Sequence, residues 1–361
     1  MQDTPLAALL RARIAADGPI SIAAYMSVAL GHPEHGYYAT RDPLGAAGDF
    51  TTAPEISQMF GEMIGLWLAE RQTSLGPETR PVLVELGPGR GTLMADALRA
   101  APPLRSLPLW LIEISPSLRA EQAKRLASAQ WAETLEAVPE APLLIVANEF
   151  IDALPMRQYL GDGARWREVQ VGLGDGGALA LGLSAPLPGG PTAAPLPGSP
   201  TAAPVRGAWA EQSPAAERVM REIARRIAAH SGAALVIDYG YRAAGRPAGP
   251  TLQAVRAHAR TDPLAAPGEA DLTWLPDFDA LATAAAPLAA FHAPQGGFLA
   301  ALGIGRRAEA LARARPAEAG AIADALERLT LPQAMGTRFR VLALVPAGSP
   351  APPGFSEERT E

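Results

Sequence analysis

The stretch VELGPGRGT, residues 84–92, carries three glycines that alternate with Pro88 and Arg90. A glycine-rich turn between a strand and a helix lets the backbone approach a nucleotide-like ligand closely. The stretch lacks the Lys that precedes Ser or Thr in a phosphate-binding loop, which excludes a nucleoside triphosphate. The dinucleotide fingerprint G-x-G-x-x-G would place its third glycine at position 92, where this chain has Thr. The missing glycine weakens the dinucleotide alternative without removing it.

S-adenosylmethionine is the third candidate ligand, because it has no phosphates but carries a methionine tail, a ribose diol and a sulfonium. The residues of the turn predicted to bind it are Glu85, Gly87, Gly89 and Gly91. An acid at the end of the next strand can accept hydrogen bonds from both ribose hydroxyls, and Glu113 in LWLIEIS stands at that position. A plain tight turn, and an exposed strand end for Glu113, are the structural alternatives.

The elements that must position these residues alternate between strands and helices. PVLVEL, LPLWLIEIS, APLLIVANEF and ALVIDYG are short apolar runs typical of buried strands, with helical segments between them. This alternation predicts an α/β fold with a mostly parallel, Rossmann-like sheet. MRQYL, RWREVQVGL and ALALGL are separated by Gly and Asp turns, which predicts an antiparallel β insertion.

Five consecutive segments are expected along the chain. Residues 1–75 form an N-terminal helical and loop region that covers the active site, and residues 76–155 form the first half of the core. Residues 156–212 hold the β insertion and a loop rich in Pro and Ala, to which no catalytic role is assigned. Residues 213–346 form the second half of the core with additional helices, and residues 347–361 form a flexible tail.

Composition excludes several classes of protein. The 361 residues carry a net charge of −6 and no cysteine, which excludes disulfides, zinc-thiolate sites and cysteine nucleophiles. The negative charge argues against binding a nucleic-acid backbone. We predict no metal site, because no further ligand cluster accompanies His32 and His35. We predict no membrane insertion, because no uncharged apolar stretch of about 18 residues is present. The N-terminus does not resemble a signal peptide, and the composition is typical of a GC-rich bacterial genome, so a bacterial cytoplasmic location is expected.

Several blocks of sequence occur in one order from about residue 20 to residue 345. They include GYYATRDPLGAAGDFTTAPEISQMFGEMIG, VELGPGRGTLMADALR, EISPSLRAEQAKRL, NEFIDALPMRQY, LVIDYGY, TLQAVRAHARTDPLAAPGEADLT and MGTRFRVL. With these blocks the chain resembles the MidA-like family of class I methyltransferases. The resemblance implies a seven-stranded methyltransferase sheet and S-adenosylmethionine as the cofactor. Through the family's mitochondrial complex I assembly member, it also implies symmetric dimethylation of an arginine on a complex I subunit.

One departure from the family pattern follows the GEADLT block. Residues 274–278 read Trp-Leu-Pro-Asp-Phe, where the family usually has Ala-His-Val before Asp-Phe. No role for a histidine at that place carries over to this chain.

An arginine acceptor is cationic, so the site should offer carboxylates that orient the guanidinium and stabilise charge as a proton leaves. The predicted catalytic residues are Glu149 and Asp152, in NEFIDALP, and Asp49, in GDFTTAPEISQ. Glu149 is the first choice for orienting the substrate or accepting its proton. Capping of a following helix is the structural alternative for Glu149 and Asp152.

Three further residues are predicted to bind the cofactor. Asn148 either contacts the cofactor or holds the loop in which it lies. If the early loop folds over the cofactor, Thr51 and Thr52 would touch either its methionine end or the substrate. For Thr52 a helix cap is an equally good interpretation, since Pro54 follows at the start of a predicted helix.

The sequence thus predicts an S-adenosylmethionine-dependent methyltransferase that acts on a protein arginine side chain, with a link to complex I assembly. The expected partner is a protein substrate, for example a complex I subunit, and no nucleic acid. Two alternatives remain open: an assembly or scaffold protein that binds S-adenosylmethionine with little catalysis, and an NAD-binding oxidoreductase.

Overall fold

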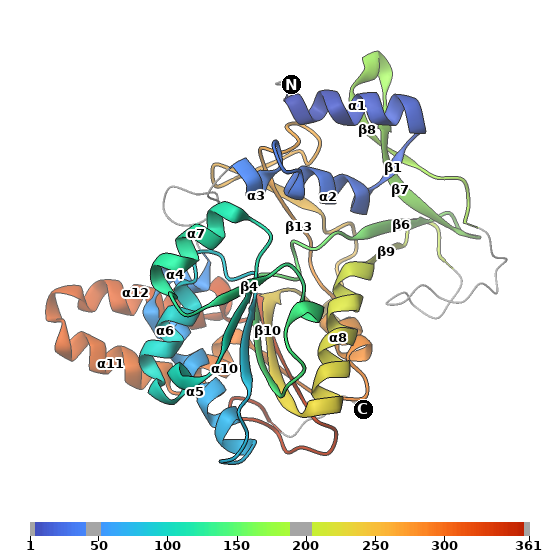
Figure 1. The fold of residues 1–361 in the computed structure, drawn as a ribbon. Helices are drawn as coiled ribbons and strands as arrows, with labels where there is room; N and C mark the ends of the chain where they lie inside the picture. Colours follow the sequence, from blue (N-terminus) through green and yellow to red (C-terminus); the bar gives the residue numbers. More distant parts are fainter. Residues whose placement is uncertain (1–3, 41–51, 188–203, 357–361) are drawn as a thin grey trace. The chain divides into compact units, whose positions relative to one another are not determined.

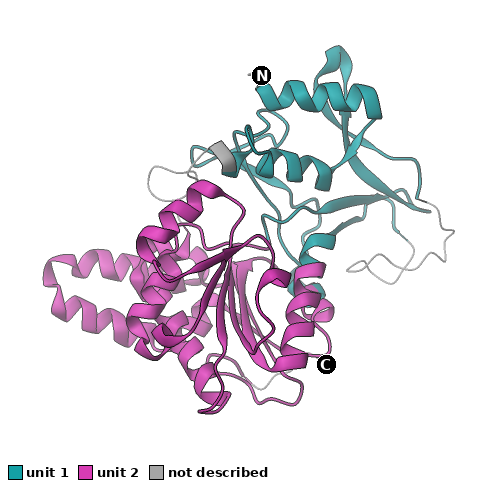
Figure 2. Ribbon diagram, in the orientation of Figure 1, with its two compact units in different colours: residues 1–43, 152–217, 242–280 teal, residues 44–151, 218–241, 281–361 magenta. Residues whose placement is uncertain are grey.

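The computed structural model describes residues 4–40, 52–187 and 204–356 (Figure 1). It contains two compact units (Figure 2). Unit 1 comprises residues 1–43, 152–217 and 242–280, and unit 2 comprises residues 44–151, 218–241 and 281–361. Each unit therefore collects three separate stretches of chain, whereas the segments expected from the sequence are consecutive.

Unit 2 is built on a seven-stranded sheet with the order β14-β15-β10-β5-β2-β3-β4. The neighbours from β10 to β4 pair in parallel, while β15 runs antiparallel to both β10 and β14. Parallel pairing brings the carboxyl ends of β2, β3, β5 and β10 to one edge of the sheet. The strands of unit 2 are β2 (Val82–Leu86), β3 (Leu109–Ile112), β4 (Gln130–Ala132), β5 (Leu143–Asn148), β10 (Gly232–Tyr239), β14 (Ala289–Pro294) and β15 (Phe339–Val345).

The central strands of this sheet are buried along their whole length, which explains their continuous apolar runs. Every residue of β2 and β5 is buried, as expected for parallel strands that helices cover on both faces. In Figure 1, α8 lies on one side of the sheet, and α5, α6, α10 and α11 lie on the other. The α-helices of unit 2 are α4 (Ala53–Ile56), α5 (Gln58–Ser74), α6 (Thr92–Ala100), α7 (Pro116–Arg125), α10 (Gln295–Ala301), α11 (Ile304–Ala314), α12 (Ala319–Thr330), all but the first turn of α8 (Pro214–His230) and the last part of α9 (Phe278–Ala284).

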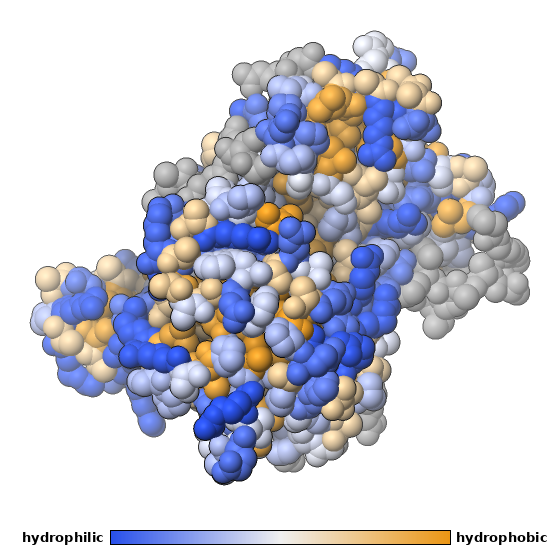
Figure 3. Space-filling model, in the orientation of Figure 1, coloured by the Kyte–Doolittle hydropathy of each residue, from blue (hydrophilic) through white to orange (hydrophobic). Residues whose placement is uncertain are grey.

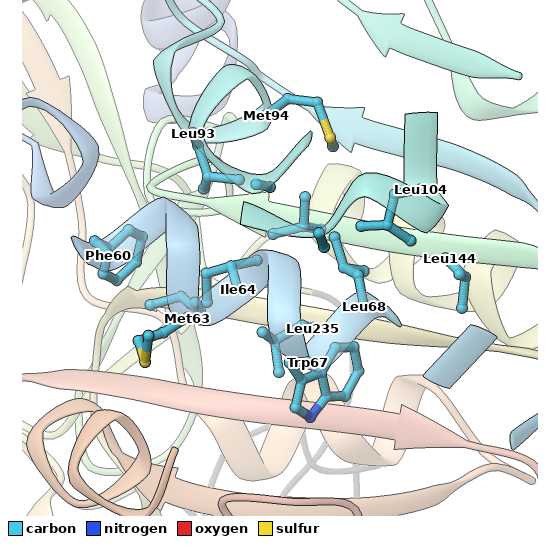
Figure 4. Close-up of a cluster of buried hydrophobic side chains, with 14 of the residues drawn as sticks. Phe60, Met63, Ile64, Trp67, Leu68, Leu93, Met94, Leu104, Leu144 and Leu235 are labelled. Atoms are coloured by element: carbon cyan, nitrogen blue, oxygen red, sulfur yellow. The ribbon is translucent and has the colours of Figure 1, made fainter. Parts of the chain in front are cut away.

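The core of unit 2 fixes the helix that follows the glycine turn. Phe60, Ile64 and Trp67 of α5 pack with Leu93 of α6 and with Leu235 of the sheet (Figure 4). The two helices approach closely because glycines stand at their crossing. A Cβ atom on Gly65 would lie 2.6 Å from the Cα atom of Ala97. The close approach fixes the position of α6, and with it the end of the glycine turn.

Unit 1 consists of two antiparallel sheets with helices. The β insertion predicted from the sequence is present, because β6 pairs antiparallel with β7 and with β9, and β7 pairs antiparallel with β8. The elements of unit 1 are α1 (Pro5–Asp17), β1 (Ile20–Ser21), α2 (Ile22–Gly31), α3 (Tyr37–Thr40), β6 (Arg157–Gly161), β7 (Trp166–Leu173), β8 (Leu179–Leu183), β9 (Trp209–Gln212), β11 (Gln253–Arg256), β12 (Ala259–Thr261), β13 (Asp271–Thr273) and the first part of α9 (Phe278–Ala284).

The α/β class expected from the sequence is confirmed, with parallel pairing confined to five strands of one sheet. The last strand, β15, is antiparallel to both of its neighbours and lies inside the sheet, because β14 pairs with its outer side. Hydrophilic and hydrophobic residues are interspersed over the visible face of the molecule (Figure 3). Among the residues that the structure describes, no helix combines the length and apolar character that a membrane crossing requires.

Candidate cofactor and acceptor site

The glycine turn after β2 has a backbone that only glycine adopts easily. Gly87, Gly89 and Gly91 have φ angles of 61°, 53° and 77°, in the left-handed region. A Cβ atom on Gly87 would lie 2.7 Å from the Phe150 ring, so the space beside this backbone is also closed to a side chain. Gly91 is the N-cap residue of α6, which places the N-terminus of that helix at the end of the turn.

Glu85 lies on β2, two residues before the turn, and is almost completely buried. Burial raises the pKa of its carboxyl to about 8. Its Oε2 atom has no hydrogen-bond partner among the residues that the structure describes. A buried acid without a partner is costly, and a ligand that brings N–H donors or positive charge would satisfy it.

Glu113 follows β3 and is buried, so it is not an exposed strand end. Its carboxylate accepts a hydrogen bond from the Ser115 amide at 2.8 Å and one from Gln122 Nε2 at 3.3 Å. Burial raises the pKa of Glu113, and the hydrogen bonds from Ser115 and Gln122 oppose that rise. The carboxylate is thus held in a fixed orientation at the edge of the sheet where β2 and β5 also end.

Asn148 and Glu149 stand at the end of β5. Glu149 has a φ angle of 50°, which is unusual for a residue with a side chain and costs free energy. Its amide donates to the Ile237 carbonyl at 2.9 Å, and its Oε1 atom accepts from the Ala53 amide at 3.1 Å. Asn148 Nδ2 donates to the same Oε1 atom at 3.2 Å, while Asn148 Oδ1 is buried without a hydrogen-bond partner among the described residues.

The helix-cap alternative for Glu149 and Asp152 does not hold, because residues 151–156 form a turn and not a helix. Asp238, at the end of β10, holds this turn. The Asp238 side chain is fully buried and accepts the Ile151 amide at 2.8 Å and its own neighbour's amide, that of Tyr239, at 2.8 Å. Asp238 therefore supports the backbone that carries Glu149, a role that the sequence pattern did not indicate.

The short helix α4 connects the ends of β5 and β2. At its start, the Ala53 amide binds Glu149, as described above. Within it, Glu55 Oε1 accepts a hydrogen bond from Thr92 Oγ1 at 2.6 Å, at the first residue of α6. Thr52 is the N-cap residue of α4, with no hydrogen bond from its side chain to the helix. Thr92, the residue that counted against a dinucleotide in the sequence, thus has a defined structural partner.

The other predicted residues lie elsewhere. Asp152 belongs to unit 1, where its carbonyl accepts the Trp274 amide at 3.2 Å and its side chain lies near Tyr38. The Tyr38 hydroxyl donates to Asp271 at 3.1 Å. Burial raises the pKa of Tyr38, and Asp271 and Asp152 raise it further. Asp49 and Thr51 lie outside the described residues.

Unit 2 therefore brings together Glu85, the glycine turn, Glu113, Asn148, Glu149 and Thr52 at one edge of its sheet. Two buried oxygen atoms, on Glu85 and Asn148, have no hydrogen-bond partner within the described part of the chain. Together with the left-handed glycine backbone, they are what a ligand with a cationic amine and a polar ribose would require. Glu55 and Asp238 are not among the predicted site residues, and they act through hydrogen bonds between segments that are far apart in the chain.

Comparison with known families agrees with this arrangement. Residues 63–294 match the model of a family of S-adenosyl-L-methionine-dependent methyltransferases. This range contains the strand ends of β2, β3, β5 and β10 that carry the site.

Curated relatives match over nearly the whole chain. The mitochondrial protein arginine methyltransferase NDUFAF7 homolog of Drosophila melanogaster is 35% identical over 374 residues, covering 94% of this chain and 85% of the relative. The mitochondrial protein arginine methyltransferase NDUFAF7 of Homo sapiens is 34% identical over 377 residues, covering 95% of this chain and 84% of the relative.

A solved structure shows the same fold. A Burkholderia thailandensis protein, bound to S-adenosyl-homocysteine, superposes with a TM-score of 0.85 at 27% sequence identity, covering 99% of this chain and 95% of that chain. The prediction of S-adenosylmethionine as the cofactor is confirmed, and the dinucleotide alternative loses its support. This chain belongs to the family of S-adenosyl-L-methionine-dependent methyltransferases.

Proposed function

We propose that this protein transfers the methyl group of S-adenosylmethionine to the guanidinium of an arginine in a protein substrate. The observation that carries the proposal is the carboxylate of Glu149, held on a left-handed backbone at the end of β5 beside the cofactor-binding strand ends. The relatives named as protein arginine methyltransferases support arginine as the acceptor.

The residues of unit 2 suit the cofactor. Bound S-adenosylmethionine supplies an electrophilic methyl group on a sulfonium. The buried Oε2 of Glu85 and Oδ1 of Asn148 would accept hydrogen bonds from its ammonium group. Glu113 would accept the ribose hydroxyls, and Gly87, Gly89 and Gly91 leave the backbone of the turn open to close approach. We assign Thr51 and Thr52 to the same cofactor.

Glu149 has the central role on the acceptor side. An arginine must present one nitrogen in line with the transferred methyl group, and a carboxylate orients a guanidinium through paired hydrogen bonds. The positive charge and the leaving proton are stabilised by the same carboxylate. A role of Asp152 and Asp49 toward the acceptor stays a prediction.

We propose a respiratory complex I subunit as the protein substrate, as the resemblance to the family implies. The expected cover of the active site by residues 1–75, and the cytoplasmic location, stay predictions. A role confined to binding and assembly, without methyl transfer, is the contrary outcome that the experiment must distinguish.

The experiment measures the transfer of radiolabelled methyl groups from S-adenosylmethionine into proteins of a lysate. Glu149→Gln keeps the Oε1 acceptor for Ala53 and removes the negative charge, so we expect kcat to fall about 10²-fold or more. The affinity for S-adenosyl-homocysteine should stay close to that of the wild type. Gly89→Val should abolish cofactor binding and labelling together, because valine is strained at a φ of 53°.

Two results would contradict the proposal. Cofactor binding without any labelled protein in the wild type would show a binding role only. Undiminished labelling by Glu149→Gln would show that Glu149 does not serve the acceptor.

A further inference from the structure

We infer that Gln122 is a positioning residue that holds the glycine turn and the Glu113 carboxylate in one fixed arrangement for cofactor binding. The inference rests on the proposed role of Glu113 as the acceptor of the ribose hydroxyls. Gln122 lies on α7 and is completely buried. No step of the proposed function has used it so far.

The side chain of Gln122 contacts three different parts of unit 2. Its Nε2 atom donates to the Gly89 carbonyl at 2.7 Å and to Glu113 Oε2 at 3.3 Å. Its Oε1 atom accepts a hydrogen bond from the Trp131 indole at 2.7 Å. One amide group therefore joins the turn after β2, the acid after β3 and the strand β4.

These contacts need both the donors and the acceptor of an amide. A glutamine side chain offers two N–H donors and a carbonyl oxygen, whereas a glutamate offers no donor and a lysine no acceptor. An apolar residue of the same size would leave the partly buried Gly89 carbonyl and Trp131 N–H without these partners.

The geometry also explains how Gln122 would act on the cofactor without touching it. Gly89 has a left-handed backbone, which does not by itself fix which way the peptide carbonyl points. The bond from Gln122 directs that carbonyl toward α7, and the second bond directs the Glu113 carboxylate. The glycine turn and the Glu113 carboxylate are thereby fixed relative to each other.

Gln122 also bears on the charge of Glu113. Burial raises the pKa of Glu113, and the hydrogen bonds from the Ser115 amide and from Gln122 oppose the rise. The charged group that acts on this carboxyl is Arg119, whose guanidinium binds the Glu113 carbonyl oxygen at 2.8 Å. Loss of the Gln122 donor should therefore raise the pKa of Glu113 further. Once protonated, this acid can no longer accept hydrogen bonds from both ribose hydroxyls.

The test measures the affinity of the full-length protein for S-adenosyl-homocysteine by calorimetry between pH 6 and pH 9. Gln122→Met should weaken binding by about tenfold or more, and the loss should grow as the pH falls. Gln122→Glu keeps the size of the side chain. It should bind weakly at high pH and recover as its acid is protonated, which is the opposite trend.

Trp131→Phe and Glu113→Gln complete the set. Trp131→Phe removes the indole donor and part of the ring but leaves both bonds from Gln122 Nε2, so it should cost less affinity than Gln122→Met. If Glu113→Gln binds like the wild type, the ribose role of Glu113 is wrong and the inference on Gln122 is wrong with it. If Glu113→Gln loses affinity while Gln122→Glu keeps the wild-type affinity and pH profile, the inference alone is overturned. Gln122→Glu gives this answer even if Gln122→Met does not fold.

Discussion

Two acidic side chains of this site lower the stability of the fold, Glu85 through its burial and Glu149 through its left-handed backbone. Neither cost is explained by packing, since an apolar residue at position 85 and a glycine at position 149 would remove it. Such costs are found where a protein prepares a site for a charged ligand. At the scale of single residues, Glu85 and Glu149 therefore lower the stability of the fold at the positions where the proposed function needs an acid.

The first prediction concerns Glu85 and pH. The pKa of Glu85 is raised to about 8 in the folded state, so between pH 4.5 and pH 8 the folded state holds a proton that the unfolded state has lost. The ligand-free wild type should therefore lose stability across this range, by about 1.4 kcal/mol for each unit of pKa difference. Glu85→Gln should match the wild type near pH 4.5, and should exceed it by a growing margin that levels off above pH 8.

Thermal unfolding of both proteins without cofactor measures this margin. Glu78→Gln, which changes an exposed carboxylate, serves as the control and should show no such growth. A margin for Glu85→Gln that stays constant from pH 5 to pH 9 would be inconsistent with a protonated, buried Glu85.

The second prediction concerns the left-handed backbone of Glu149. Glu149→Gly and Glu149→Ala both remove the carboxylate and its bond to Ala53, so both should lose methyl transfer. Only glycine relieves the strain of a φ angle of 50°, so Glu149→Gly should be more stable than Glu149→Ala by about 1 kcal/mol. Urea unfolding compares the two variants. Equal stabilities would mean that the left-handed conformation carries no strain.

At the scale of elements, the site depends on how closely α5 and α6 pack behind the glycine turn. Gly65→Ala should destabilise unit 2 by about 1–3 kcal/mol, because the new methyl group would lie 2.6 Å from the Ala97 backbone. The matched control is Gly305→Ala on α11, where nothing lies within 4 Å and helix propensity favours alanine. Chemical unfolding should show opposite signs for the two variants, and a neutral Gly65→Ala would contradict the close packing.

Elements with strong local signals could be predicted from the sequence. The strands predicted at PVLVEL and APLLIVANEF are present where the pattern placed them. β14 was not predicted, because AAFHAP is rich in alanine, ends in proline and lacks β-branched residues. The roles of Gln122, Glu55 and Asp238 could not be predicted, since they depend on contacts 33, 37 and 87 residues away along the chain.

At the scale of the whole molecule, the chain passes between its two units several times. Residues 152–217 and 242–280 leave unit 2 after β5 and after β10, at the two strand ends that carry Glu149 and Asp238. Composition could not reveal this, because the three segments of each unit are joined by long-range pairing rather than by any local pattern. The insertions follow strand ends where open α/β sheets bind their ligands, which relates the layout of the chain to its chemistry.

The central claim is methylation of an arginine side chain, and it is tested most directly in the cell. Quantitative mass spectrometry of complex I subunits compares cells with the gene, without it, and without it but supplied with either the wild type or Glu149→Gln. The proposal predicts a methylated arginine that disappears with the gene and returns with the wild type only. Arginine methylation that is unchanged in the absence of the gene, across these subunits, would contradict it.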